Sequence, residues 1–182
     1  MNVHTSRFIA RKQQRGAVLI VSMLLLLVLT ILALGASQTT RLEERMAGNT
    51  RDIDMAFQAS EAGLRAAEQY IAATPTLATC LDSTSASCYV LEQGHFSTID
   101  LARQNEDWWR ANGKAFGTPS TQEVVGVVEE PRYVIEEFQS VPFSLVAGFG
   151  PQPGKTYYKS TAWSPGATDT SHAVVESVFS RE

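Results

Sequence analysis

The residues best suited to chemistry in this sequence lie at one abrupt boundary near its start. Arg15 and Gly16 are followed, without a spacer, by the apolar residue Ala17. Because glycine lacks a Cβ, an extended backbone at Gly16 can lie close in the cleft of a protease. A polar leader joined directly to an apolar segment suits a protease at a membrane surface. The chemistry that this boundary offers is therefore proteolysis, with the chain as the substrate.

The second pair of reactive residues is Cys80 and Cys88, the only cysteines in the chain. Both follow the apolar segment, on the side that we expect to be exported. Two cysteines in an oxidising compartment predict a disulfide. Closing so short a loop would stabilise the fold by roughly 2–3 kcal/mol in the chain-entropy model. The alternative is a pair of free thiols in a reducing cytosol.

The remaining polar residues do not predict an active site. His95 and His172 have no second histidine or cysteine nearby, as a zinc site would need. The acidic pairs Glu129–Glu130 and Glu136–Glu137 supply too few oxygens from one loop for calcium. No glycine-rich phosphate loop precedes a helix. We therefore predict no enzyme activity, no metal, no cofactor and no small-molecule substrate.

An apolar run extends from Ala17 to Ala36, with only Ser22 and Thr30 polar. Both hydroxyls can return to the helix backbone. Twenty helical residues span about 30 Å, the thickness of the hydrocarbon core of a bilayer. A soluble helix would show a polar face, and this run shows none. The sequence therefore predicts a membrane-spanning helix.

Charge is distributed unevenly about this run. Residues 1–16 carry four basic side chains and no acidic one, whereas the chain as a whole has a net charge of −4. Basic residues before an apolar run hold that end in the cytoplasm, so the rest of the chain would cross. The acidic remainder argues against nucleic-acid binding, which needs clustered Lys and Arg.

Three kinds of processing are compatible with an apolar run near the start of a chain. A secretory signal would be cut at its end, near Ala33–Gly35. A signal anchor would stay uncut. A third kind of leader would be cut on the cytoplasmic side, before the run. Gly16, which abuts the first apolar residue, favours this third kind.

Residues 15–68 resemble the N-terminal signature of the PilX-type minor pilins of type IV pilus assembly. The segments LEERMAGN at 42–49 and AFQASEA at 56–62 carry the resemblance best. It covers about a third of the chain. The resemblance implies cleavage after Gly16 by a prepilin peptidase and N-methylation of the new amino terminus at Ala17. It also implies the inner membrane of a Gram-negative bacterium, with the head in the periplasm before assembly.

Two residues depart from the usual pilin pattern. Most pilins have Phe where this chain has Ala17, and Glu where it has Val21. In the family, that Glu is thought to pair with the terminal ammonium of a neighbouring subunit, since a buried ammonium without a partner is costly. A subunit with Val21 has no carboxylate to pair with the ammonium of a subunit ahead of it. Its own Ala17 ammonium can still pair with the Glu of a subunit that arrives behind it. We therefore expect a position at or near the filament tip; the alternative is drift at a tolerant position.

The implied partners are other minor pilins, the major pilin and a PilY-type tip adhesin. The implied roles are initiation of the pilus (fimbrium), adhesion and twitching motility. The main rival is a minor pseudopilin of type II secretion, of the K-like tip type. A membrane-anchored periplasmic binding module and an exported protein cut near Gly35 are further alternatives.

One helix is predicted over residues 17–73, because no proline occurs between Ala17 and Pro75. So long a helix cannot be packed along its whole length by its own chain, so its membrane half must find partner helices. Beyond Thr40 the helix becomes striped, with a ridge at steps of three or four residues formed by Leu42, Met46, Asn49, Ile53, Phe57, Ser60, Leu64, Ala67 and Ile71.

The head is predicted to contain a Cys-bearing loop from Leu77 to Tyr89 and a short helix within residues 99–112, capped by acids. Of its adjacent tryptophans, Trp108 and Trp109, only one can face the core. The predicted strands are Glu123–Val128, Arg132–Phe138, Lys155–Ser164 and His172–Phe179.

The predicted fold class is α+β and pilin-like. A long N-terminal helix, transmembrane in its N-terminal half, packs on a roughly four-stranded antiparallel sheet. The predicted domains are a cleaved leader (1–16), the transmembrane part of the helix (17–40), its amphipathic continuation (41–74) and an extracytoplasmic head (75–182).

Overall fold

The computed structural model describes residues 16–81, 89–117, 123–143 and 154–181. The chain divides into two units, Met1–Ala47 and Gly48–Glu182, which are treated separately below. The helix α1 covers Ala17–Ala73, as the sequence predicted. The remaining helices are the 3-10 helix η1 (Leu101–Arg103) and α2 (Glu106–Asn112), and the strands are β1 (Thr79–Cys80), β2 (Val90–Leu91), β3 (Lys114–Ala115), β4 (Arg132–Pro142), β5 (Gly154–Pro165) and β6 (His172–Arg181).

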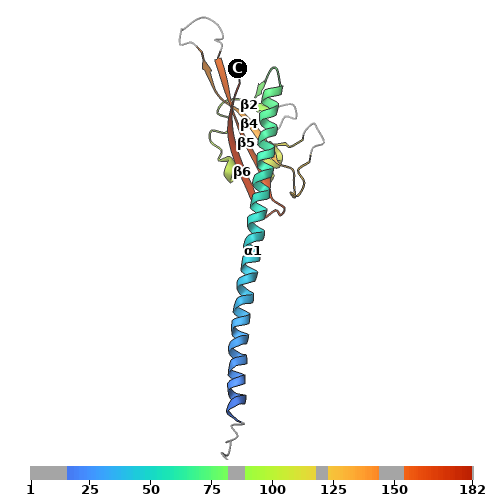
Figure 1. The fold of residues 1–182 in the computed structure, drawn as a ribbon. Coiled ribbons are helices and arrows are strands. Elements are labelled where there is room, and N and C mark those ends of the chain that lie inside the picture. The colour runs from blue at the N-terminus through green and yellow to red at the C-terminus, as the bar shows by residue number, and fades with distance from the viewer. Residues whose placement is uncertain (1–15, 82–88, 118–122, 144–153, 182) are drawn as a thin grey trace, which may run out of the picture. The chain divides into compact units, whose positions relative to one another are not determined.

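Figure 1 shows the second unit as a sheet with the C-terminal part of α1 lying along one face. The strand order is β1-β2-β4-β5-β6, and β3 pairs with β4. The three long strands β4, β5 and β6 are antiparallel. The two pairs β1–β2 and β2–β4 are parallel. The α+β, pilin-like class is thus confirmed, but the sheet is mixed and has six strands rather than about four.

Two predicted details of the head are wrong. Cys80 lies in the two-residue strand β1, inside the segment that was predicted to be a loop. The predicted helix within 99–112 is divided, because Gln104 is extended (ψ 142°) and ends η1. Asn105 then caps α2 by accepting a hydrogen bond from the Trp108 amide at 3.0 Å, with Glu106 and Asp107 in the first turn.

The predicted strand Glu123–Val128 is also wrong. These residues form a turn in which Gly126 has φ +99°, a conformation that valine avoids. A Cβ on Gly126 would lie 2.7 Å from the Met55 Cε atom. The Val124 amide donates to the Glu130 carboxylate at 3.2 Å instead of to a neighbouring strand. Val125 is therefore 95% exposed rather than packed on a sheet.

A hydrophobic core lies on each face of the sheet. The first core joins α1 to the sheet and contains Leu64, Ala67, Ile71, Val90, Tyr133, Ile135, Tyr158 and Ala162. The second core lies on the opposite face, beneath η1 and α2, and contains Leu91, Phe96, Leu101, Trp109, Val134 and Trp163. Alternate residues of β4 point to opposite faces, so Tyr133 and Ile135 join one core and Val134 the other.

The adjacent tryptophans divide their roles. Trp109 is fully buried, and its ring stacks on Trp163 with centroids 6.3 Å apart. Trp108 is half-buried and meets the edge of Phe96 at 5.8 Å. Both indoles therefore pack within the head: Trp109 lies in the core, and Trp108 covers its margin.

Close packing between α1 and the sheet depends on small residues. A Cβ on Gly63 would lie 3.1 Å from the Pro131 Cβ atom and 3.5 Å from that of Ala162. The predicted ridge is buried at Ser60, Leu64, Ala67 and Ile71, but Ile53 and Phe57 remain about half exposed. The ridge therefore packs on the sheet only over its last part.

Three polar contacts fasten β6 to α1. The Ser60 hydroxyl donates to the Ala173 carbonyl at 2.9 Å, and the Ser177 hydroxyl donates to Glu68 at 2.7 Å. Arg181 donates to the Ile71 carbonyl at 3.0 Å and to the carbonyls of Thr74 and Pro75. Those carbonyls lie at the end of α1, where a cation satisfies acceptors that the helix leaves open.

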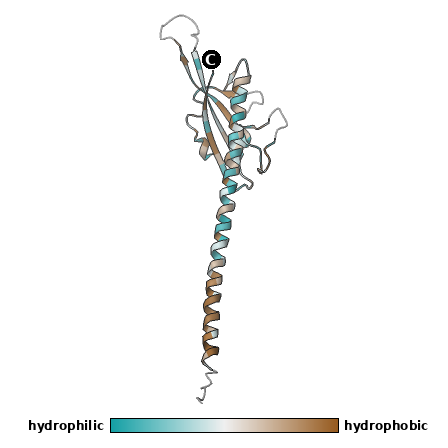
Figure 2. Cartoon of the chain, in the orientation of Figure 1, coloured by the Kyte–Doolittle hydropathy of each residue, from teal (hydrophilic) through white to brown (hydrophobic). Residues whose placement is uncertain are grey.

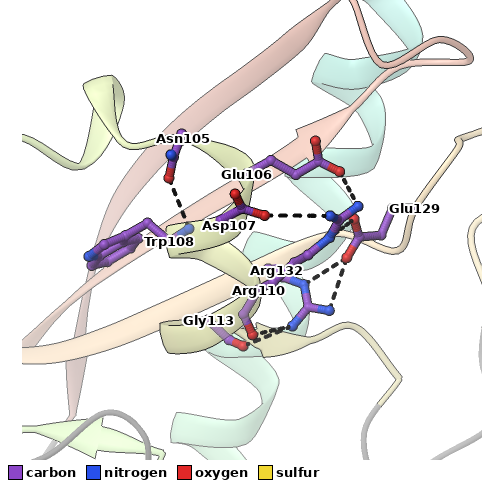
Figure 3. A network of polar contacts seen from close by, with 8 residues as sticks. All are labelled: Asn105, Glu106, Asp107, Trp108, Arg110, Gly113, Glu129 and Arg132. Carbon is purple, nitrogen blue, oxygen red and sulfur yellow. Dashed lines mark hydrogen bonds and ion pairs between the residues drawn. The ribbon is translucent and has the colours of Figure 1, made fainter.

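An ion-pair network fastens α2 to the sheet (Figure 3). Glu129 accepts hydrogen bonds from Arg110 at 2.8 Å and from Arg132 at 2.9 Å. Arg110 also pairs with Glu106, and Arg132 donates to the Arg110 carbonyl at 3.1 Å. Burial alone raises the pKa of Glu129, but the hydrogen bonds from Arg110 and Arg132 outweigh it, so the pKa lies below its ordinary value.

Replacing Gly63 should test the close helix–sheet contact. We expect Gly63→Leu to lower the free energy of unfolding by about 1–3 kcal/mol, because the added side chain has no room. Gly48→Leu is the matched control, since no described atom lies within 4 Å of its Cβ position. The measurement is denaturant unfolding of the full chain in detergent micelles. Equal effects of the two substitutions would contradict this packing.

Replacing Glu129 should test the network and its pH dependence. A carboxyl whose folded pKa is lowered stabilises the fold above its unfolded pKa of about 4.3, and this contribution is lost as pH falls through the folded value. Glu129→Gln should therefore cost about 1–2 kcal/mol at neutral pH. The difference from the unmodified chain should shrink between about pH 5 and pH 3.

The control for this measurement is Glu123→Gln, at an exposed carboxylate in the neighbouring turn. We expect it to leave the unfolding free energy within about 0.5 kcal/mol of the unmodified chain. A Glu129→Gln chain whose deficit stays constant down to pH 3 would refute the role assigned to the Glu129 carboxylate.

Candidate functional site

The predicted processing junction lies at the exact start of the first helix. Gly16 forms a turn, and α1 begins at Ala17. Among the described residues, no atom comes within 4 Å of the position that a Gly16 Cβ would occupy. Arg15 and the rest of the leader lie outside the described residues. The junction is thus open on the side of the helix, and cleavage there remains a prediction.

The N-terminal half of α1 is hydrophobic along its length (Figure 2). The exposure of its large apolar side chains runs from 48% at Val28 to 67% at Val18, and none is buried. Leaving such surface in water costs about 25 cal/mol per Å². In the part of the chain that the structure describes, α1 is the helix whose length and composition would allow it to cross a membrane.

The polar groups within this apolar half are satisfied by their own helix. Ser22 donates to the Leu19 carbonyl at 2.8 Å, and Thr30 donates to the Leu27 carbonyl at 2.7 Å. This confirms the prediction that both hydroxyls return to the backbone. Because hydrocarbon offers no hydrogen-bond partner, such internal pairing is what a lipid-exposed helix requires.

Val21 lies on the second turn of α1 and is 54% exposed. Its isopropyl group offers no acceptor for an ammonium. The first turn contains no acidic residue either. The described start of this helix therefore presents an apolar surface without a carboxylate, and the role of Val21 in assembly remains a prediction.

The other predicted residues lie in the second unit. Cys80 is disulfide-bonded, whereas Cys88 lies outside the described residues, so the Cys80–Cys88 pairing remains a prediction. His95 and His172 lie in different elements: His95 is followed by Phe96 of the second core, and His172 begins β6. Across residues 16–81, 89–117, 123–143 and 154–181, no group of three His, Cys, Asp or Glu side chains is placed to hold a metal ion.

Sequence reasoning missed a polar clamp at Asp52 of α1. Its carboxylate accepts hydrogen bonds from Ser171, the Thr168 hydroxyl and the Thr168 amide, the last at 3.1 Å. Hydrogen bonds from Ser171 and then Thr168 hold the pKa of Asp52 below its ordinary value. The clamp joins the helix to the turn between β5 and β6. No local pattern connects these residues, which lie 116 positions apart.

Part of α1 resembles a known protein family. Residues 15–65 match the family model described as PilX N-terminal. No curated protein and no solved structure shows a significant match to the chain. The matched residues include the Gly16–Ala17 junction, the entire apolar run and the start of the helix–sheet contact.

Pilins are structural subunits rather than enzymes, and they associate with other components of a pilus. The match and the exposed apolar helix together indicate a membrane-anchored, pilus-associated chain. Residues 15–65 are thus similar to the N-terminal segment of PilX-type type IV pilins.

Proposed function

We propose that this chain is a minor pilin that helps to initiate type IV pilus assembly and belongs to a tip-proximal complex. The observation that carries the proposal is the apolar surface of α1 from Ala17 to Ala36, where every residue is exposed among the residues that the structure describes. Such a surface needs either lipid or other apolar helices. A pilin needs both in turn, first in the membrane and then in the filament.

The proposed mechanism is templating. The chain is held in the inner membrane of a Gram-negative bacterium with its head in the periplasm, and the prepilin peptidase cuts after Gly16. N-methylation of Ala17 then completes the mature amino terminus. Lipid tails are as apolar as leucine, so helix association there depends on packing and hydrogen bonds rather than on the hydrophobic effect. The exposed side chains of α1 would supply that packing surface for neighbouring subunits.

Val21 supports a position at the tip. A subunit without the usual carboxylate cannot neutralise the ammonium of a subunit placed ahead of it, and an unpaired charge in an apolar setting is costly. The Ala17 ammonium can still be neutralised by a subunit that arrives behind. This asymmetry suits the first position in a filament better than an internal one.

The proposed partners are other minor pilins, the major pilin and a PilY-type tip adhesin. Adhesion and twitching motility would then follow from the pilus that this chain helps to start. In this proposal the chain consists of a leader (1–16), a transmembrane segment (17–40), an amphipathic continuation (41–74) and a head (75–182). A disulfide between Cys80 and Cys88 would close the loop that precedes β2.

Intact-mass analysis of the protein from cells should test the processing step. We expect a mature chain that begins at N-methylated Ala17. Gly16→Val should lower processing at least tenfold, equivalent to about 1.4 kcal/mol of transition-state stabilisation, because the branched side chain would block close approach of the backbone. Gly35→Val is the control and should be processed normally. A start at Ala36 or at Met1 would exclude both a pilin and a pseudopilin.

Substitution at Val21 should test the tip position. Val21→Glu would supply the missing carboxylate, and we expect it to change the number of surface pili and to move some of this chain from filament ends into filament shafts. Val21→Gln is the control of equal size without the charge. The measurement is immunogold electron microscopy of surface pili, with protein levels matched by immunoblot. Unchanged pilus number and position in Val21→Glu would remove the main support for the tip.

Deletion of the gene would separate pilus assembly from type II secretion. Loss of twitching with normal secretion supports the pilin, whereas loss of secretion with normal twitching supports the K-like pseudopilin.

A further inference from the structure

The outer edge of β6 is long, regular and open. β6 pairs with β5 through ten consecutive residue pairs, from Thr156–Arg181 to Pro165–His172, without a register shift. β6 ends the strand order, and no described strand pairs with its other side. In an antiparallel strand, alternate residues direct their N–H and C=O groups away from the paired neighbour. Along the outer edge of β6 these groups form a row that no described strand pairs with.

This edge has few of the features that usually protect an edge strand, because its acidic and basic side chains are limited to Glu176 and, at its end, Arg181. Monomeric proteins blunt their edges with short strands, lysines, prolines or bulges. At the other end of the sheet, β1 has only two residues. β6 has ten residues, no lysine and no proline, and it is rich in strand-forming Val and Phe. Val178 stands 53% exposed on it.

The strand is also held in place before any partner binds. Its inner face is fastened to α1 through Ser60, Glu68 and Arg181, as described above. These contacts fix one face of β6 and leave the in-plane edge unpaired. A pre-ordered strand loses little conformational freedom on binding, which favours the addition of another strand.

Charge on the opposite face indicates what the added strand would carry. Lys159 lies between two carboxylates, 3.7 Å from Glu136 and 3.9 Å from Glu176. Glu136 is buried, whereas the Glu176 side chain at the edge is 53% exposed. A row of acid, base and acid therefore crosses β4, β5 and β6 and ends on an acid. Opposite charges on neighbouring strands stabilise a sheet, so the next member of the row would be a base.

A groove beside Glu176 has room for such a side chain. It has a volume of about 280 Å³ and lies between η1 and β6, with Asp100, Lys159, Val174 and Glu176 among its lining residues. Asp100 is paired with Arg103 at 3.1 Å, but its side chain is 58% exposed. The aliphatic part of a Lys or Arg would lie against Val174 and its charge near Glu176.

We propose that the outer edge of β6 accepts an extended segment of another subunit, which adds a strand to the sheet and places a Lys or Arg beside Glu176. A second copy of this chain fits poorly, because its own β6 has no Lys or Arg on that face, which consists of His172, Val174, Glu176, Val178 and Ser180. The identification of the partner as a pilus subunit depends on the proposed function. The addition of a strand is argued from the edge of β6 alone.

Photo-crosslinking in cells that assemble pili tests this proposal. A benzophenone amino acid is placed in the full chain at His172 or at Val178, and the crosslinked peptides are mapped by mass spectrometry. These positions lie about 20 Å apart along a strand, so the partner residues should be about six apart if extended and about thirteen apart if helical. The same probe at Val125, which is 95% exposed and lies off the edge, is the control.

We expect adducts from the two edge positions, and none from Val125, to one extended partner segment that carries a Lys or Arg. Glu176→Lys should lower the Val178 adduct roughly three- to tenfold, and Asp169→Lys, the same change in the exposed turn before β6, should not. The proposal would be overturned if the crosslinked partner residues were spaced as in a helix, or if the partner were β6 of a second copy. It would also be overturned if adducts formed only at Val125 or not at all. A chain that starts at N-methylated Ala17 but gives no edge adduct would refute the strand addition and leave the pilin assignment intact.

Discussion

The apolar side chains of residues 17–36 need surroundings that the described part of their own chain does not provide, and much of the structure follows from this constraint. The helix satisfies its backbone groups internally, and Ser22 and Thr30 return their hydroxyls to it. Nothing polar is therefore left to oppose entry into hydrocarbon. The same surface, with side chains exposed on all sides, suits packing among several helices in a filament. One segment can thus serve in two apolar environments without refolding.

The head shows how the second half of α1 differs from the first. Small residues, above all Gly63, bring the helix close to β5, and a second core on the far face of the sheet is closed by Trp109. The cores are fastened at their margins by polar contacts, with Asp52 at the β5–β6 turn and Glu129 under α2. Packing of α1 on its own sheet thus begins only after the uniformly apolar pattern has ended. The apolar half of the helix is exposed, whereas its C-terminal part forms one side of the first core.

The fold was predictable where the signal was local. The apolar run, the absence of proline and Thr74–Pro75 predicted α1, and runs of β-branched and aromatic residues predicted β4, β5 and β6. The two-residue strands β1, β2 and β3 were missed, because two residues cannot display a period. The valines of Glu123–Val128 suggested a strand, but Gly126 in a left-handed conformation turns the chain instead.

The roles of Gly16, Ala17 and Val21 remain predictions. They could be proposed from the sequence because these residues are neighbours and stand within a segment that resembles a known family. The contacts of Asp52, Glu129 and Arg181 were not predicted, because their partners are brought together only by the tertiary fold. No spacing rule connects a carboxylate on a helix with hydroxyls in a distant turn.

The contact of Arg181 with the end of α1 also has a consequence for the order of folding. Arg181 and Ile71 lie 110 residues apart, and Arg181 belongs to β6, which follows the other described strands in the sequence. Contacts between residues so far apart in the sequence cost loop-closure entropy before they contribute stability, so domains that depend on them fold slowly. The sheet of a growing chain would remain incomplete until β6 has been synthesised. A chain shortened by a single strand at its carboxyl end would keep an intact anchor but present an unfinished domain.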